Sequence, residues 1–596
     1  MKEFIKYTLA TVTGIVLLCT SMAVLGLFSV FAMLATGSST PKVAPNSVLA
    51  IKLSGTVEER ANDNMTPVFR LMGSDMETMG LDQIVGAIRK AKGEGNVKGI
   101  YIEAGPVTFD SPATAAAIRK ALADFKKSGK WVVAYGDEYT QAAYYIASVA
   151  DKVYLNTTGM IDFRGMGSKI MYLKGLYDKI GVRYQATRVG KYKSYVEQQT
   201  RTGMSAEDRE QRTAYLSGIW QAMLRGIAAS RKVSAKALDG YANDSILLFA
   251  DQKDYQKMKL VDKLLYPEEL QQEIKGRLGL EKDDDITQVS VTDMGALPEP
   301  HDGEGDEIAV YYAVGGITDQ DISAITGEQG IVGRTMAEDL GALADDDNVK
   351  AVVIRVNSGG GSATASEQIW HAVKKLRQRK PVVVSMGGMA ASGGYMISCA
   401  ANYIIAEPQS VTGSIGIFGL IPNVSGLMTD KLGITFSEVG TNRYTNAMEN
   451  LTMDKDNTDV LNMMQTYVDR GYDRFLAIVA DGRKMTKRQV HAIAQGRVWL
   501  GADAARIKLV DRLGSLDDAV AKAASLAKAG SYHTASYPAQ SSWWETLLQQ
   551  QMGSGNYLDA GMRELLGSNY GEWVALRTAD KRGRLQAALP FSVTIE

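Results

Sequence analysis

One serine stands in a glycine-rich stretch that could support nucleophilic catalysis. The sequence GGMAASGGY, residues 387–395, places Ser392 directly after an apolar run. Glycines around a serine let backbone N–H groups approach its hydroxyl, as a hole for a developing oxyanion requires. The candidate N–H donors are Gly393, next to the serine, and Gly360 and Gly361 of a second glycine run. The competing interpretation is that these glycines only form tight turns after buried strands.

A serine hydroxyl is a weak nucleophile and needs a base within hydrogen-bond reach. No histidine adjoins a glycine motif, although the sequence leaves open that His371 or His491 approaches from a distance. Lysine is the known alternative base, because a buried lysine can lose its proton whereas arginine cannot. The sequence VGKYKSYVEQ, residues 189–198, offers Lys193. The competing interpretation of Lys193 is an ordinary solvated side chain.

An internal duplication relates the two candidates. Asn96 and Asn348, which begin two NVK motifs, are 252 residues apart, and the KLVD motifs at Lys259 and Lys508 are 249 apart. In each copy, strand-like apolar runs alternate with helical patterns, which is typical of an α/β protein with largely parallel strands. Two unrelated α/β domains would not keep a register constant within three residues.

Each copy serves as a control for the other. Gln141 stands opposite Ser392, and the first copy also lacks the glycine run. Arg443 stands opposite Lys193, and arginine stays protonated. The copy with the serine therefore lacks a usable base, and the copy with the lysine lacks the serine. We expect one composite site that is built from both copies.

The N-terminus predicts a membrane anchor. No charged residue occurs between Tyr7 and Pro41, and residues 15–34 supply the roughly 20 apolar residues that cross a bilayer. A cleaved signal peptide is the alternative, but its apolar region is shorter and a small-x-small cleavage site follows it. Lys2 and Lys6 flank the membrane entry, so the positive-inside rule predicts that the rest of the chain lies outside the cytoplasm.

Composition excludes several other classes of protein. The 66 Lys and Arg residues balance 67 Asp and Glu residues, so no excess positive charge predicts nucleic-acid binding. The two cysteines, Cys19 and Cys399, and the four histidines show no metal-ligand spacing. We expect neither a metal nor another cofactor.

Four motifs together resemble the family of long bacterial signal peptide peptidases A, also called protease IV, from the anchor to about residue 530. They are RVNSGGGSATASE (355–367), VVVSMGGMAASGGY (382–395), TGSIGIFG (412–419) and RVGKYKS (188–194). Gly359 stands where the family usually has a proline. The resemblance implies that Ser392 is the nucleophile, Lys193 the general base and Ser414 the hydroxyl that orients the lysine.

The same resemblance implies the fold, the partners and the location. The fold is α/β, with tandem Clp-protease-like (crotonase-like) domains behind one transmembrane helix. The substrates are cleaved signal peptides and other hydrophobic peptides. The assembly is a homotetramer anchored in the bacterial inner membrane by lipid contacts of the N-terminal helix, with its catalytic domains on the periplasmic side.

The expected divisions of the chain follow from these assignments. They are a cytoplasmic stub and anchor (1–45), a repeat carrying the lysine (46–296), an acidic Pro/Gly linker (297–307), a repeat carrying the serine (308–535) and an unassigned C-terminal extension (536–596). Two other functional classes stay open. An acyl-CoA enzyme of the crotonase type would share the fold and the oxyanion hole, and an inactive membrane scaffold would share the anchor and the repeats.

Overall fold

The computed structural model describes residues 42–60, 78–244, 247–298, 305–322, 330–539 and 586–588, with a few positions before residue 22. Among these residues, no helix is both long enough and apolar enough to span a bilayer. The expected anchor at residues 15–34 lies largely outside the described part of the chain. Membrane insertion therefore stays a prediction.

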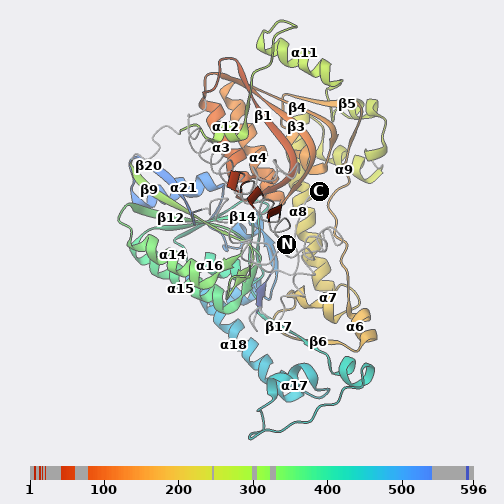
Figure 1. Cartoon of the computed structure of the whole chain (residues 1–596), viewed down its shortest axis with the longest axis vertical. Helices are drawn as coiled ribbons and strands as arrows, with labels where there is room; N and C mark the ends of the chain where they lie inside the picture. The colour runs from red at the N-terminus through yellow and green to blue at the C-terminus, as the bar shows by residue number, and fades with distance from the viewer. Residues whose placement is uncertain are drawn as a thin grey trace.

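The first repeat is built on a sheet of parallel strands, at the top of Figure 1. Its order is β2-β1-β3-β4-β5-β7, with β8 paired to β1. The strands are β1 (Ser47–Glu58), β2 (Thr78–Gly80), β3 (Val97–Phe109), β4 (Trp131–Tyr139), β5 (Lys152–Ile161), β7 (Lys263–Leu264) and β8 (Gln288–Ser290). Their buried Val, Ile and Leu side chains match the apolar runs in the sequence, as parallel strands covered on both faces require.

The second repeat contains the corresponding sheet, lower in Figure 1. Its order is β18-β16-β14-β12-β9-β20, with β15 between β14 and β19. The strands are β9 (Asp306–Val314), β12 (Val349–Ser358), β14 (Val382–Ala391), β15 (Tyr403–Ala406), β16 (Val411–Gly413), β18 (Val498–Leu500), β19 (Arg512–Leu513) and β20 (Tyr532–Tyr537). The α/β prediction is confirmed, and the duplication is visible as two sheets with the same succession of strands.

Equivalent helices cover the two sheets. The pairs are α3 (Leu81–Gly93) and α14 (Gly333–Asp345), α4 (Pro112–Phe125) and α15 (Ala363–Arg379), α5 (Gln141–Ala147) and α16 (Gly393–Ser398), α8 (Ala206–Arg231) and α18 (Thr458–Arg483), α10 (Gln252–Lys257) and α20 (Gly501–Arg506), and α11 (Pro267–Leu278) and α21 (Leu516–Ala527). Ser111 and Ser362 cap α4 and α15 by accepting a backbone N–H, which explains why both helices begin where they do. Local capping thus reproduces the same turn in both copies.

A smaller sheet joins the repeats, in the order β11-β10-β13-β21-β17-β6. Its strands are β6 (Arg183–Arg188), β10 (Ile317–Thr318), β11 (Ile331–Val332), β13 (Gly360–Ser362), β17 (Phe418–Asn423) and β21 (Gln586–Ala588). β6 of the first repeat runs antiparallel to β17 of the second, with Phe418 opposite Arg188. This pairing brings the segment after β6, which includes Lys193, to the second repeat.

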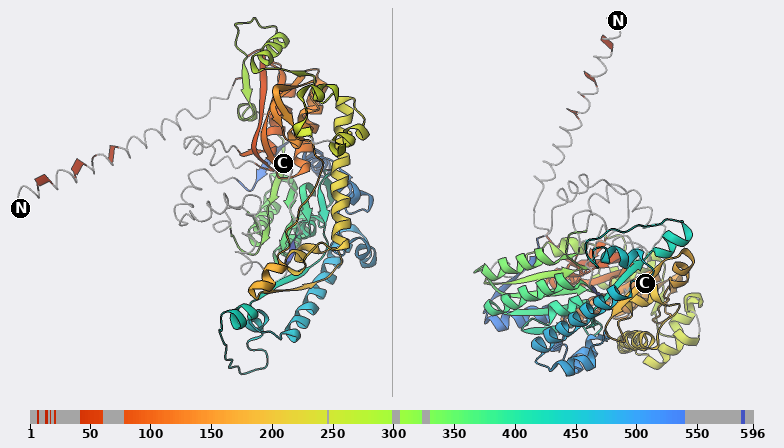
Figure 2. Two further views of the ribbon diagram at one scale, coloured as in Figure 1. Left: turned by 90° about the vertical axis from the view of Figure 1, so that its right-hand side faces the viewer. Right: turned by 90° about the horizontal axis from the view of Figure 1, so that it is seen from below.

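The hydrophobic core is also continuous between the repeats. One cluster of buried side chains includes β3 and α8 of the first repeat together with Ala391, Val411, Val498 and Leu500 of the second. Figure 2 shows α8, in yellow, running lengthwise beside strands of both repeats. The two halves therefore share apolar surface where the candidate site residues lie.

Candidate active site

Ser392 lies at the sharp turn between β14 and α16. Its φ of 57° is in the positive region that non-glycine residues rarely adopt, and such strain is typical of functional turns. Its N–H donates to the carbonyl of Gly413 at 2.8 Å, and the residue is fully buried. The turn fixes the hydroxyl at the carboxyl end of the sheet.

Lys193 lies between β6 and the 3₁₀ turn η2 (Ser194–Val196), and it is also fully buried. Its Nζ lies 2.8 Å from the Oγ of Ser392. Burial lowers the pKa of Lys193 well below the ordinary value for lysine, because the charged ammonium loses its solvation. The geometry thus joins a serine of one repeat to a lysine of the other, as the reciprocal absences in the sequence lead one to expect.

Ser414 is the third polar group around the amine. Both its Oγ and its backbone carbonyl oxygen lie 3.0 Å from the Nζ of Lys193. Its N–H donates to the carbonyl of Arg497 at 2.7 Å, and its φ of 50° is again positive. A neutral amine has two N–H groups and one lone pair. If the N–H groups donate to the two oxygens of Ser414, the lone pair faces Ser392.

The segment around Lys193 packs tightly against residues 495–498 of the second repeat. The N–H of Tyr192 donates to the carbonyl of Gln495 at 3.0 Å. A Cβ on Gly496 would lie 2.6 Å from the backbone N of Lys193, so only glycine fits there. The sequence interpretation missed Gly496. Its signal is a difference between the copies, because the residue 249 positions earlier is Leu247.

The candidate oxyanion glycines lie around the serine in different settings. Gly393 follows Ser392 directly as the first residue of α16. The N–H of Gly360 donates to the Oγ of Ser358 at 3.2 Å, and Gly360 has a positive φ of 94°. A Cβ on Gly361 would lie 1.9 Å from the carbonyl oxygen of Ile317. Close packing therefore also requires Gly361, so the turn interpretation and the catalytic one are both compatible with this residue.

The histidines and the counterpart residues have other contacts. His491 Nδ1 lies 3.0 Å from the hydroxyl of Tyr472, and His371 lies in α15, with its ring near that of Trp370. Gln141 accepts the N–H groups of Arg164 and Gly165 through its side-chain oxygen. Arg443 is exposed and forms an ion pair with Asp459. Within the part of the chain that the structure describes, the Ser392 hydroxyl lies within hydrogen-bond distance of Lys193.

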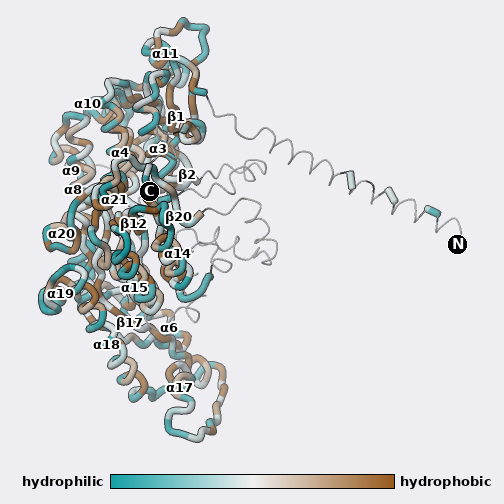
Figure 3. The backbone as a smooth tube through the Cα atoms, turned by 90° about the vertical axis from the view of Figure 1, so that its left-hand side faces the viewer, coloured by the Kyte–Doolittle hydropathy of each residue, from teal (hydrophilic) through white to brown (hydrophobic). Residues whose placement is uncertain are grey.

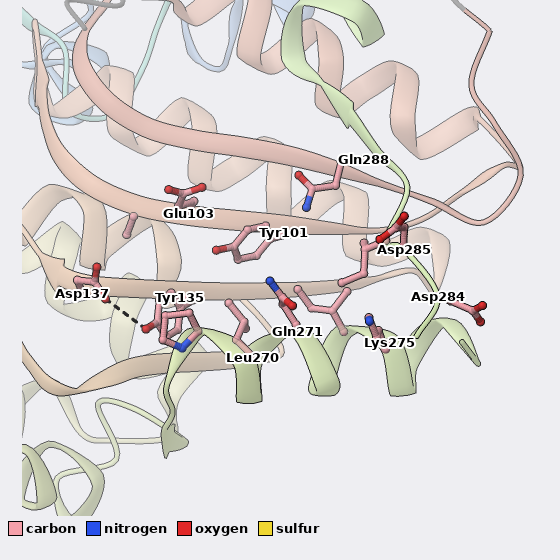
Figure 4. Close-up of a pocket in the computed structure, with 14 residues that line it drawn as sticks. Tyr101, Glu103, Tyr135, Asp137, Leu270, Gln271, Lys275, Asp284, Asp285 and Gln288 are labelled. Carbon is pink, nitrogen blue, oxygen red and sulfur yellow. Dashed lines mark hydrogen bonds between the residues drawn. The ribbon is translucent and has the colours of Figure 1, made fainter. Parts of the chain in front are cut away.

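A polar cavity in the first repeat is separate from this cluster. It lies between α11 and the sheet and has a volume of about 440 Å³. Figure 4 shows Tyr101, Glu103 and Tyr135 along its sheet side, with Gln271 and Lys275 on α11 opposite them. Neither Ser392, Lys193 nor Ser414 lines it. Among the described residues, no group of His, Cys, Asp and Glu side chains is arranged to hold a metal ion.

Comparisons with known proteins agree with this architecture. The chain is 37% identical over 557 residues to Protease 4 of Salmonella typhi, covering 89% of this chain and 88% of that protein. It is 36% identical over 452 residues to Protease 4 of Haemophilus influenzae, covering 74% and 72%. It is 27% identical over 488 residues to the chloroplastic serine protease SPPA of Arabidopsis thaliana, covering 80% and 69%.

Models of two protein families also match the chain. A model of the Clp protease family matches residues 319–411. The model of peptidase family S49 matches twice, at residues 124–281 and 374–530, once in each repeat. The chain therefore belongs to peptidase family S49 and is a serine protease with tandem Clp-protease-like domains.

Proposed function

We propose that Ser392 and Lys193 form the catalytic dyad of this protease, with Ser414 orienting the amine. The observation that carries the proposal is the 2.8 Å contact between Lys193 Nζ and Ser392 Oγ in a fully buried setting. A base must lie within hydrogen-bond reach of the proton that it removes, and a lysine must be neutral to remove it. Burial of Lys193 favours the neutral amine.

The reaction then follows from the geometry. Lys193 Nζ takes the hydroxyl proton as Ser392 Oγ attacks the carbonyl carbon of the peptide bond. The resulting ammonium gives that proton to the leaving amine nitrogen, and the peptide is left as an ester on Ser392. Water attacks the ester with Lys193 again as base, which releases the acid and restores the serine. Throughout, the oxygens of Ser414 accept N–H groups of the amine.

The developing oxyanion requires N–H donors beside Ser392. We assign this role to Gly393 and to Gly360 or Gly361. Gly393 N–H begins α16, where the first N–H groups of a helix have no partner within the helix. Gly360 N–H is engaged by the hydroxyl of Ser358 in this structure, so its use would require that hydroxyl to turn away.

The small joining sheet suggests how a peptide substrate binds. β21 lies between β13, the strand of Gly360 and Gly361, and β17, and it is antiparallel to both. The position between β13 and β17 in this sheet is thus occupied by one extended strand of this chain. A substrate would bind there as an extended strand in the place of β21, with backbone hydrogen bonds on both sides and side-chain pockets that choose alternate residues.

We propose cleaved signal peptides and other hydrophobic peptides as the substrates. The support is the resemblance of the four motifs together with an apolar N-terminal segment long enough to hold the enzyme at a membrane. An inner-membrane anchor at residues 15–34, with the repeats 46–296 and 308–535 on the periplasmic side, would place the proposed dyad on the same side of the membrane as such remnants.

The internal duplication also suggests how copies assemble. Within the chain, β6 of the first repeat pairs with β17 of the second. The motif VG at residues 189 and 439 relates β6 to residues 433–438, and Ser414 and Phe163, 251 residues apart, relate β17 to residues 167–172. Neither segment forms a strand, so the reciprocal pair is not made within one chain.

Both unpaired segments expose apolar side chains. Met171 is 46% exposed, and Ile434 and Phe436 are 41% and 48% exposed. Residues 433–438 lead to the extended tip that carries α17 (Ala447–Met453), and Figure 3 colours part of this tip as hydrophobic. We propose that residues 433–438 of one copy pair with residues 167–172 of the next. Such a head-to-tail contact closes into a ring, for which the family resemblance suggests four copies.

A labelling experiment tests the catalytic proposal on the full chain in detergent. A fluorophosphonate probe should label wild type at Ser392, as located by peptide mass, and should leave folded Ser392→Ala unlabelled. An acyl-CoA enzyme would instead bind acyl-CoA without hydrolysing peptides, and an inactive scaffold would stay unlabelled. Labelling at another residue, or none on folded wild type, would contradict the dyad.

Two further measurements test substrate and assembly. A synthetic signal peptide should be cleaved with a higher kcat/KM than a polar peptide of equal length; equal values would contradict the substrate class. Light scattering should give a tetramer for wild type and smaller species for Phe436→Asp. Phe249→Asp, which changes an exposed phenylalanine of the first repeat, is the control. A monomeric wild type would overturn the assembly and leave the dyad intact.

A further inference from the structure

Gln211, in α8, contacts both the segment that carries Lys193 and the second repeat. Its Nε2 donates to the carbonyl of Tyr192 at 3.0 Å and lies 3.1 Å from the Oγ of Ser194. Its Oε1 accepts the N–H of Val498 at 3.3 Å. The side chain is 1% exposed. One buried amide therefore bridges the residues on either side of Lys193 to a strand of the other repeat.

Val498 leads directly to the other members of the cluster. It begins β18, in which Val498 pairs with Gly413 of β16. The Gly413 carbonyl accepts the N–H of Ser392, and the Arg497 carbonyl, one residue before Val498, accepts the N–H of Ser414. The chain of contacts thus runs from the backbone of the lysine segment, through Gln211 and β18, to the backbones of both serines.

Two neighbours on the same helix hold Gln211 in place. Asp208 accepts from Gln211 Nε2 at 3.0 Å and from the hydroxyl of Ser194 at 2.6 Å. Arg212 donates to the other oxygen of Asp208 at 2.7 Å. Asp208 and Arg212 are buried, so these bonds are shielded from water and the amide has little freedom to rotate. Gln211 thus contacts the part of the site that each repeat supplies, Tyr192 in the first and Val498 in the second.

The equivalent helix of the second copy is the natural control. α8 and α18 have the same length, and both end in a lysine with positive φ, Lys232 and Lys484, which are 252 residues apart. This offset places Val460, Met463 and Met464 opposite Asp208, Gln211 and Arg212. The segment that follows β6 carries Lys193, whereas its counterpart carries the exposed Arg443. The three polar residues Asp208, Gln211 and Arg212 therefore occur in the copy that carries Lys193.

We infer that Gln211 is a positioning residue of the reaction, which sets the distance between Lys193 and the two serines across the repeat boundary. The inference rests on the proposed dyad. Gln211 touches neither the hydroxyl of Ser392 nor the amine of Lys193, so it acts through backbone. A displacement of about 1 Å from productive geometry can cost about 100-fold in rate, which makes such a link kinetically important.

The test is Gln211→Met, which keeps the length of the side chain and is the residue that α18 has at this position. We expect kcat for peptide cleavage to fall by about 10- to 100-fold with KM within about twofold. We also expect the rising limb of the pH profile of kcat/KM to move to higher pH. A loosened segment admits water to the amine, which raises the pKa of Lys193, and the base is neutral only above its pKa.

Controls separate this role from a merely structural one and from the dyad itself. Gln221→Ala changes an exposed glutamine of the same helix and should leave kcat and the pH profile as in wild type. Gln211→Met should be assayed well below its own unfolding temperature. An unchanged kcat and pH profile in that variant would overturn the inference even if the unfolding temperature falls. Activity in Lys193→Ala would instead overturn the dyad, so the two failures are distinguishable.

Discussion

The two repeats have the same fold but differ at each position that the proposed chemistry uses. In the second repeat, Ser392 occupies a strained turn and Ser414 lies beside it. In the first, Gln141 holds the backbone of Arg164 and Gly165, and Phe163 fills the position of Ser414 and packs on Trp220. The second repeat thus has two buried hydroxyl groups at these positions. The first repeat has a hydrogen-bonded amide and a packed aromatic ring instead.

The segment that follows β6 in the first repeat and its counterpart in the second repeat also differ, and here the first repeat has the residue that the proposed chemistry uses. Lys193 is fully buried against the other repeat, and Gly496 leaves room for its backbone. Arg443 lies at an exposed position with Asp459. A permanently charged guanidinium belongs at such a surface, whereas a lysine can enter a dry site by losing its proton. The comparison shows that each copy contributes one member of the proposed dyad and that neither contains both.

The largest effects should follow from changing the two residues that are reciprocal between the copies. Ser392→Ala and Lys193→Ala should each lower kcat/KM for a peptide by at least about 1,000-fold, because one removes the nucleophile and the other the base. Lys193→Arg should be as inactive, since it keeps the charge but not the basicity. Peptidase assays on variants with wild-type circular dichroism provide the measurement.

The counterpart residues supply the matched controls. Gln141→Ala and Arg443→Lys should leave kcat/KM within about threefold of wild type, because Gln141 bonds to the backbone of its own repeat and Arg443 is exposed beside Asp459. More than about a tenth of wild-type activity in Lys193→Arg would refute the general-base role.

Gly496→Ala should have the next largest effect. The added Cβ would lie 2.6 Å from the backbone N and 2.7 Å from the Cβ of Lys193, and the φ of 78° is strained for alanine. Displacement of the lysine should lower kcat/KM by about 100-fold or more. Gly341→Ala is the control, since nothing lies within 4 Å of a Cβ there. A Gly496→Ala enzyme as active as Gly341→Ala would show that the lysine segment tolerates movement.

The sequence predicted the candidate reactive residues of this site better than the residues that position them through packing. Ser392 and Lys193 could be proposed from the sequence because the paired copy has Gln141 and Arg443 in their places, and the structure brings the two side chains together. Alternating apolar runs likewise predicted the strands, because burial on both faces requires them. Gly496 and Gln211 also differ from their counterparts Leu247 and Met463, but the sequence does not show which segments they contact. The position of β21 likewise depends on contacts between segments far apart in the chain.

A smaller effect is expected at Ser414, whose counterpart is Phe163. Ser414→Ala removes one hydrogen bond to the amine but leaves the backbone carbonyl of residue 414 in place. The loss in kcat/KM should be about 10- to 100-fold, the size of one hydrogen bond to a charged group. Ser525→Ala, at an exposed serine of α21, is the control. Equal kcat/KM in Ser414→Ala and wild type across the pH range would remove Ser414 from the mechanism.

The smallest effect concerns stability at a boundary between the repeats. Asp110 precedes the capping Ser111 of α4, as Gly361 precedes the capping Ser362 of α15. Asp110 accepts from Asn357 of the second repeat at 2.6 Å and from Thr114. Burial, and then the nearby Glu59, raise the pKa of Asp110 to about 7, while Arg355 opposes that shift. The first copy thus keeps a buried carboxyl where the second has a glycine.

The sign of the effect follows from linkage. Because the pKa of Asp110 is higher in the folded protein than in the unfolded chain, folding favours its protonated form, and its contribution to stability falls as pH rises from about 4 to about 7. Asp110→Asn abolishes this loss while its amide can still bond to Asn357 and Thr114. The free energy of unfolding of Asp110→Asn should exceed that of wild type by about 2 kcal/mol at pH 8, roughly half of what a three-unit shift in pKa allows, and by less at pH 5.

Urea unfolding at both pH values measures the difference, with Asp283→Asn, at an exposed aspartate, as the control. If the difference between Asp110→Asn and wild type were the same at pH 5 and pH 8, Asp110 would not titrate between these values in the folded protein, which would contradict the raised pKa.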